Sequence, residues 1–159
     1  MNDVSQRIAP AAIRKTIKVN APIDRAFEVF ARRMGEWWHK EHSIARETTQ
    51  VDVVIEPRAG GRWYEVGADG SEHMWGRVLA YEPPYRLLLA WQLTKEFNYD
   101  PNFETTVEVR FEEKDEMTIV EFEHRDLERM GADAVDLLEG MDGGWAMLLD
   151  LFKSRAEAA

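Results

Sequence analysis

The sequence has no cysteine, no long apolar run and no excess of basic residues. Without cysteine, the 159-residue chain has no disulfide framework, thiolate metal site or cysteine nucleophile. The absence of any run of 18 apolar residues excludes a membrane-spanning helix. Acidic residues outnumber basic ones by 30 to 20, whereas nucleic acids and anionic membranes bind basic patches. We therefore expect neither a nucleic acid nor a membrane surface as the main partner.

The chain also lacks linkers, internal repeats and low-complexity segments. Residues 1–10 contain no apolar signal-peptide core and precede the first strand pattern, which predicts a flexible N-terminal tail. The remaining residues, 11–159, are of ordinary domain length and predict a single domain. Without a targeting signal, we expect a cytoplasmic protein, and the sequence leaves open whether it is a monomer or a homodimer.

The acidic excess is confined to the second half of the chain. Residues 1–94 have a net charge of +1, whereas residues 95–159 have a net charge of −11. Two interpretations remain open, namely a solvated acidic face that favours solubility and an acidic docking surface for a basic partner.

The order of apolar patterns predicts an α+β protein. Alternation over residues 13–19 predicts a strand, and Pro22 followed by an apolar stripe predicts a helix over 22–33. A second short helical turn contains the adjacent Trp37 and Trp38. Six further strands are expected between residues 51 and 124, separated by turns rich in glycine, proline and aspartate.

The final hairpin and the C-terminal helix can be predicted in more detail. Placing the turn at Lys114-Asp115 pairs Val109 with Val120 and sets Glu108 opposite Glu121, with an apolar inner face and an acidic outer face. Helical spacing then runs from Val135 to Phe152. Because each glycine costs a helix about 1 kcal/mol relative to alanine, Gly143-Gly144 predicts a break, with a long helix over about 144–156.

These elements fit a curved antiparallel sheet of about seven strands wrapped round the long C-terminal helix, with two short helices after the first strand. The sequence resembles the START-like (SRPBCC) superfamily with the helix-grip fold. Within it, the sequence is similar to the activator of heat-shock-protein-90 ATPase homologue family, C-terminal-domain type. The resemblance spans about 13–155 and rests on these residues: Val19 to Pro22, Phe27, Trp37-Trp38, Gly76 to Val78, Pro83, Leu89 to Trp91, His124, Gly144-Trp145, Leu148 and Leu151.

The resemblance implies a cavity for a hydrophobic ligand, or in some members a co-chaperone role, and it brings no shared catalytic set. We rank a small-ligand binding module first, because the chain has six Trp, four Tyr and seven Phe. An interaction domain that stimulates a heat-shock-protein-90 type ATPase comes second. A cyclase- or hydrolase-like enzyme using the same cavity comes third, so an enzyme is less favoured than a binding protein.

Seven residues are the candidate ligand-binding set, chosen by strand parity and helix phase. They are Trp63, Trp75, Trp91, Phe111, Phe122, His124 and Trp145. Either Trp63 or Tyr64 faces inward, because Gly60-Gly61 obscures the parity. His124 either contacts a ligand near the cavity mouth or bonds a neighbouring backbone group. His73 and Arg77 share the face of Trp75 by parity, and they either bind an acidic ligand group or lie in solvent.

No metal site, cofactor or catalytic residue is predicted. His39 and His42 are spaced to share a metal, but no third ligand can be named. The glycine-rich turn at 58–61 lacks the Lys-Ser/Thr ending of a phosphate loop, and no dinucleotide fingerprint or nucleophile elbow occurs. The predicted partners are therefore a small apolar ligand and, in the second interpretation, a chaperone.

Overall fold

The computed structural model describes residues 11–131 and 133–158, so the tail predicted for residues 1–10 lies outside the described residues. Seven strands pair antiparallel in the order β1-β7-β6-β5-β4-β3-β2. They are β1 (Ile13–Val19), β2 (Gln50–Ile55), β3 (Arg62–Gly67), β4 (Glu72–Glu82), β5 (Arg86–Trp91), β6 (Thr105–Lys114) and β7 (Met117–Arg125). The helical elements are α1 (Ile23–Arg32), α2 (Met34–Trp37), the short 3₁₀ helix η2 (Leu127–Met130) and α3 (Val135–Ala158).

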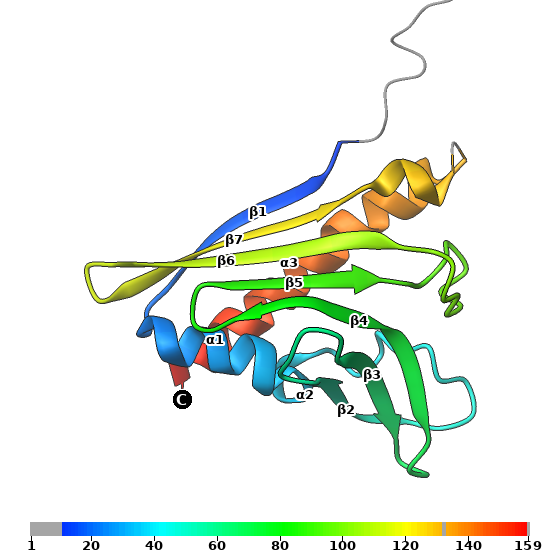
Figure 1. The fold of residues 1–159 in the computed structure, drawn as a ribbon, viewed down its shortest axis with the longest axis horizontal. Helices are drawn as coiled ribbons and strands as arrows, with labels where there is room; N and C mark the ends of the chain where they lie inside the picture. The colour runs from blue at the N-terminus through cyan, green and yellow to red at the C-terminus, as the bar shows by residue number, and fades with distance from the viewer. Residues whose placement is uncertain (1–10, 132, 159) are drawn as a thin grey trace, which may run out of the picture.

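The sheet curls, and α3 runs along its inner face while α1 and α2 lie at one end (Figure 1). This arrangement confirms the predicted α+β helix-grip fold, including the two short helices after the first strand. β1 and α1 also have nearly the bounds that their sequence patterns predicted.

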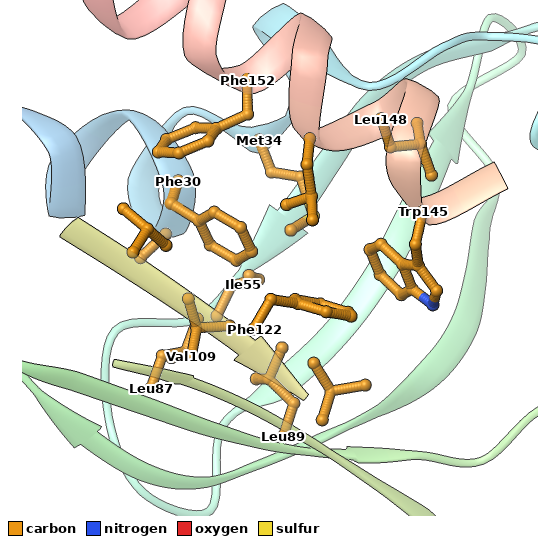
Figure 2. Close-up of a cluster of buried hydrophobic side chains, with 14 of the residues drawn as sticks. Phe30, Met34, Ile55, Leu87, Leu89, Val109, Phe122, Trp145, Leu148 and Phe152 are labelled. Atoms are coloured by element: carbon orange, nitrogen blue, oxygen red, sulfur yellow. The ribbon is translucent and has the colours of Figure 1, made fainter. Parts of the chain in front are cut away.

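The core lies between the inner face of the sheet and the three helices. Figure 2 shows Trp145, Leu148 and Phe152 of α3 directed toward the sheet, with Phe122 and Leu89 beneath them. Phe30 of α1 joins this core, with its ring centroid 5.1 Å from that of Phe152. Full burial of each such side chain contributes about 1.5–3 kcal/mol. The helices are therefore held by packing, which allows α3 to tolerate unfavourable residues.

The predicted break at Gly143-Gly144 is wrong, because α3 is continuous over 24 residues from Val135 to Ala158. The buried stripe that includes Met141, before the glycines, and Trp145 and Phe152, after them, holds α3 in place on both sides of the glycines. This burial outweighs the roughly 1 kcal/mol that each glycine costs.

The predicted register of the last hairpin is also wrong, by two residues. Val109 pairs with Phe122 and Phe111 with Val120, because the turn is centred on Asp115 and Glu116. Both turn residues have a positive φ, 53° and 67°, as a two-residue hairpin turn of primed type requires. A slip of two residues leaves every side chain on its predicted face.

The outer face of this hairpin is not a plain acidic surface. Glu108 is nearly buried and lies opposite Glu123, not Glu121. Arg125 bonds both carboxylates, at 2.6 Å and 2.8 Å, and Arg86 and Arg110 also pair with Glu108. Burial alone would raise the pKa of Glu108, but these arginines lower it to about 2. The like charges are thus neutralised by ion pairs within the sheet.

Candidate ligand-binding site

A cavity of about 540 Å³ lies between the N-terminal half of α3, the segment after α2 and the ends of β4 and β5. It opens to the surface near Glu41, Phe97 and Asp136, which are exposed. Its walls are mostly apolar and aromatic. The lining residues are Trp38, Glu41, His42, Ser43, Ile44, Trp75, Trp91, Leu93, Phe97, Asp136, Leu137, Gly140, Met141, Gly144, Trp145 and Leu148.

All six tryptophans of the chain form one continuous cluster at this cavity. Trp38 is the hub, with ring centroids 4.9 Å from Trp75, 5.7 Å from Trp145 and 5.8 Å from Trp37. Trp91 lies 5.9 Å from Trp145. Trp63 lies behind the wall, 5.5 Å from Trp75 and 5.8 Å from Trp91. Four indoles therefore line the cavity, and two support them from behind.

The segment after α2 is held against the sheet by the fully buried carboxylate of Glu65 on β3. Its Oε1 accepts hydrogen bonds from the backbone N–H of Ile44 and from Trp75 Nε1, each at 2.8 Å. Its Oε2 accepts a further hydrogen bond from Ser43 Oγ. Since Ser43, Ile44 and Trp75 all line the cavity, one carboxylate positions three wall residues.

Two glycines of α3 leave room for the cavity. Gly140 and Gly144 are four residues apart, so they lie on the same side of the helix, and both line the cavity. A Cβ on Gly140 would meet nothing within 4 Å, and one on Gly144 would meet only His42 Cε1, at 3.8 Å. Larger side chains at these two positions would therefore project into the cavity.

His124 lies below the cavity and is fully buried. Trp145 Nε1 donates to its Nδ1 at 3.2 Å, and an indole nitrogen can only donate. His124 is therefore the neutral tautomer protonated at Nε2, which donates to Thr105 Oγ1 at 2.8 Å. Burial lowers the pKa of His124 to about 3. Both ring nitrogens are engaged with side chains, and His124 connects α3 to β6 and β7.

The polar groups of the cavity lie near its opening. Glu41 and His42 belong to the segment after α2, and Asp136 to the first turn of α3. Burial and the neighbouring His39 lower the pKa of His42, so its imidazole is neutral at pH 7. Deeper in the wall, Trp91 Nε1 is buried and has no hydrogen-bond partner among the described residues. A ligand oxygen beside Trp91 would satisfy this donor.

The seven predicted site residues occupy three positions relative to the cavity. Trp75, Trp91 and Trp145 line it. Trp63, Phe122 and His124 lie one layer behind, since Phe122 packs on Trp145 at 4.4 Å and Trp63 is the inward member of the Trp63/Tyr64 pair. Phe111 lies away from the cavity, against Phe27 and Phe30 of α1.

The largest wall residue that the sequence prediction missed is Trp38. Its neighbour Trp37 faces the core, and the end of a one-turn helix gives no periodicity from which to orient the pair. Leu137, Met141 and Leu148 line the same side of α3 as Trp145, so the helix phase would have identified them.

A β-bulge explains why Arg77 does not share the face of Trp75. The partner of Trp63 is Gly76 and that of Tyr64 is Met74, which leaves Trp75 as an extra residue in β4. A bulge changes the alternation of faces. Arg77 is therefore exposed and paired with Glu104 at 2.7 Å, not beside Trp75 as parity predicted. His73 is half-buried, with Nε2 2.8 Å from Ser71 Oγ.

Within residues 11–131 and 133–158, no group of three or more His, Cys, Asp or Glu side chains is arranged to hold a metal ion. His39 and His42 lie together, with ring centroids 5.5 Å apart. None of the described helices is long and apolar enough to cross a membrane.

Several solved structures share this fold. The anthrahydroquino-gama-pyrone synthase Txn09 is 30% identical, with 90% of this chain and 97% of that chain covered and a TM-score of 0.62. CalC, a self-sacrificing resistance protein from Micromonospora echinospora, is 28% identical, with coverage of 92% and 94% and a TM-score of 0.66. Aha1 from Colwellia psychrerythraea, solved as a dimer, is 16% identical, with coverage of 93% and 97% and a TM-score of 0.65.

No curated protein sequence matches the chain. The family model described as "Activator of Hsp90 ATPase homolog 1-like protein" matches residues 20–157. This range includes strands β2 to β7, helices α1 and α2, and all of α3 except its last residue. This match agrees with the resemblance seen in the sequence, and the chain belongs to that family.

Proposed function

We propose that the protein binds a small, largely apolar aromatic molecule in the cavity beneath α3. The observation that supports this most strongly is the cavity itself, about 540 Å³ in volume with four tryptophans in its wall. Ligand sites typically measure about 300–1,000 Å³ and combine apolar walls with a few polar groups. Here the polar groups are gathered near the opening, so a ligand would enter with its ring system first.

One relative supports the same class of ligand. The synthase that is 30% identical is named for an anthrahydroquino-γ-pyrone, a fused aromatic ring system, and its fold spans 90% of this chain. A flat ring system also suits tryptophan walls, because aromatic pairs gain about 0.5–1.5 kcal/mol beyond the area that they bury.

A pair of glycine substitutions tests the proposal. The probe is 9-anthracenemethanol, a neutral three-ring compound, with binding measured by titration calorimetry. Gly144→Leu should weaken binding at least about tenfold, because the new side chain occupies the cavity. Gly143→Leu is the matched control, since Gly143 is exposed, does not line the cavity and has open space at its Cβ. Both substitutions should stabilise α3 by roughly 1 kcal/mol. Equal binding by the two variants would contradict the proposal.

A second candidate function is catalysis on the bound molecule. The synthase relative favours it, and so does His42, a neutral imidazole in the cavity wall that can accept a proton at pH 7. His42→Ala should then abolish turnover of a ring-closing substrate while leaving its binding nearly unchanged. Turnover unaffected by this substitution would show that His42 is not the base, and no turnover by the parent protein would leave binding as the sole function.

A further inference from the structure

The cavity contains carboxylates but no side chain that is positively charged at pH 7. Glu41 and Asp136 approach its opening from different elements, and both side chains are exposed. Neither forms an ion pair with another described residue, whereas the nearby Lys95 is already paired with Asp133 at 2.9 Å. His42, the remaining titratable group of the lining, is neutral at pH 7. The formal charge of the lining is therefore −2.

A third carboxylate lies directly behind the wall. Glu65 is fully buried and accepts three hydrogen bonds, from Ser43, Ile44 and Trp75, all of which line the cavity. No basic residue of the described chain pairs with it. Behind this part of the wall, too, the acidic side chain has hydrogen-bond donors as partners and no basic residue.

The tryptophan walls favour the same sign of charge. The face of an indole ring attracts cations, and tryptophan is the strongest of the aromatic side chains in this respect. Four indoles line the cavity, those of Trp38, Trp75, Trp91 and Trp145, and the carboxylates of Glu41 and Asp136 lie near its opening. An anionic ligand would instead meet unpaired carboxylates at the opening and an unfavourable ring face inside.

We propose that the cavity selects molecules that join a fused aromatic ring system to a protonated amine, with the amine held at the opening between Glu41 and Asp136. This inference rests on the proposed function, because it names the charge of the ligand that the same cavity binds. Asp136 lies in the first turn of α3, and Glu41 lies in the segment after α2.

Three compounds with one ring system test the inference. They are 9-(aminomethyl)anthracene, 9-anthracenemethanol and 9-anthracenecarboxylate, which are cationic, neutral and anionic at pH 7. Their dissociation constants are measured by titration calorimetry in low salt and again at physiological ionic strength. We expect the cation to bind at least about fivefold more tightly than the neutral compound, and the anion to bind most weakly. The difference should decrease with salt, because the carboxylates at the opening are exposed.

The double variant Glu41→Gln/Asp136→Asn identifies the groups responsible. It should bring the cation to within about twofold of the neutral compound and leave binding of the neutral compound unchanged. Glu139→Gln is the matched control, because Glu139 is an exposed carboxylate of α3 outside the lining. It should preserve the full preference for the cation, whereas Gly144→Leu should weaken binding of all three compounds at least about tenfold.

The possible results separate this inference from the proposed function. Binding of the neutral compound that Gly144→Leu weakens, with no preference for the cation, would overturn the inference and leave the proposed function standing. A preference for the cation that survives in the double variant would overturn the role of Glu41 and Asp136. If none of the three compounds binds, both the proposed function and the inference are wrong.

Discussion

Trp145 on α3 donates its indole N–H to Nδ1 of His124 on β7, across a distance of 3.2 Å in the fully buried layer below the cavity. This bond requires an unprotonated Nδ1, and the other ring nitrogen is engaged with Thr105. A proton added to His124 would therefore break the bond that joins the C-terminal helix to the last strand.

This relationship predicts how stability depends on pH. Burial lowers the pKa of His124 from 6.5 to about 3, so the unfolded chain binds a proton at this histidine more tightly than the folded protein does. The contribution of neutral His124 to the free energy of unfolding is complete above pH 6.5, and it is lost as the pH falls from 6.5 toward 3. By pH 5 the free energy of unfolding should have dropped by roughly 2 kcal/mol relative to pH 7.5. Urea unfolding at each pH measures the decrease.

Two variants provide the controls for this prediction. In His124→Gln most of the decrease between pH 7.5 and 5 should disappear, although the variant is less stable at every pH. His73→Gln should keep the decrease, because His73 lies near the start of β4 and takes no part in the contact between His124 and Trp145. A His124→Gln protein with the full decrease would show that another group is responsible.

Gly76 has no room for a side chain. An added Cβ would lie 1.8 Å from the carbonyl oxygen of Ala90, on the neighbouring strand. Because the obstacle is backbone, Gly76→Ala should lower the free energy of unfolding by more than about 3 kcal/mol. Gly143→Ala should instead stabilise α3 by about 1 kcal/mol. Chemical denaturation compares the two, and equal stability of Gly76→Ala and the parent would refute the close approach.

The Glu108 ion-pair network should contribute measurably to stability. Glu108→Gln removes the charge that three arginines share, which should lower the free energy of unfolding by about 2 kcal/mol. Glu112→Gln is the control on the same strand, since Glu112 is exposed and pairs with no described basic residue. Its effect should stay within about 0.5 kcal/mol. Similar effects of the two substitutions would mean that the network adds nothing.

Glu65 should control the order of the segment after α2. In Glu65→Leu the Ile44 amide and the Trp75 indole lose their acceptor, and the loss should be visible as faster hydrogen exchange at Ile44. Glu47→Gln, an exposed residue of the same segment, should leave this exchange unchanged. Protection of Ile44 that persists without the Glu65 carboxylate would show that other contacts hold the segment.

The sequence predicted the fold well because most of its strands alternate cleanly. The faces of β6 and β7 were correct although their register was not, because a slip of two residues keeps the parity. The turn at Asp115 and Glu116 could not be located, since neither residue is the glycine or asparagine that such a turn usually contains.

The site was less predictable, for local reasons. Trp75 forms a bulge that shifts the parity of β4, and the adjacent Gly76 is a signal for a bulge that does not fix its position. Trp38 follows a one-turn helix, which is too short to show the periodicity that would orient its side chain. Gly140 and Gly144 line the cavity, but in the sequence a glycine in a helix indicates only weakness. What the glycines do depends on what lies opposite them, which is a property of the tertiary structure.

The register shifts of the sheet all lie in one part of it. Register shifts occur where β2 meets β3, where β3 meets β4 and where β4 meets β5. The pairings β1–β7, β6–β7 and β5–β6 run without interruption. Trp75, and with it much of the aromatic wall, belongs to the interrupted part. If the proposed function is correct, we expect ligands of different size to be accommodated in the interrupted part, while the uninterrupted strands keep their pairing.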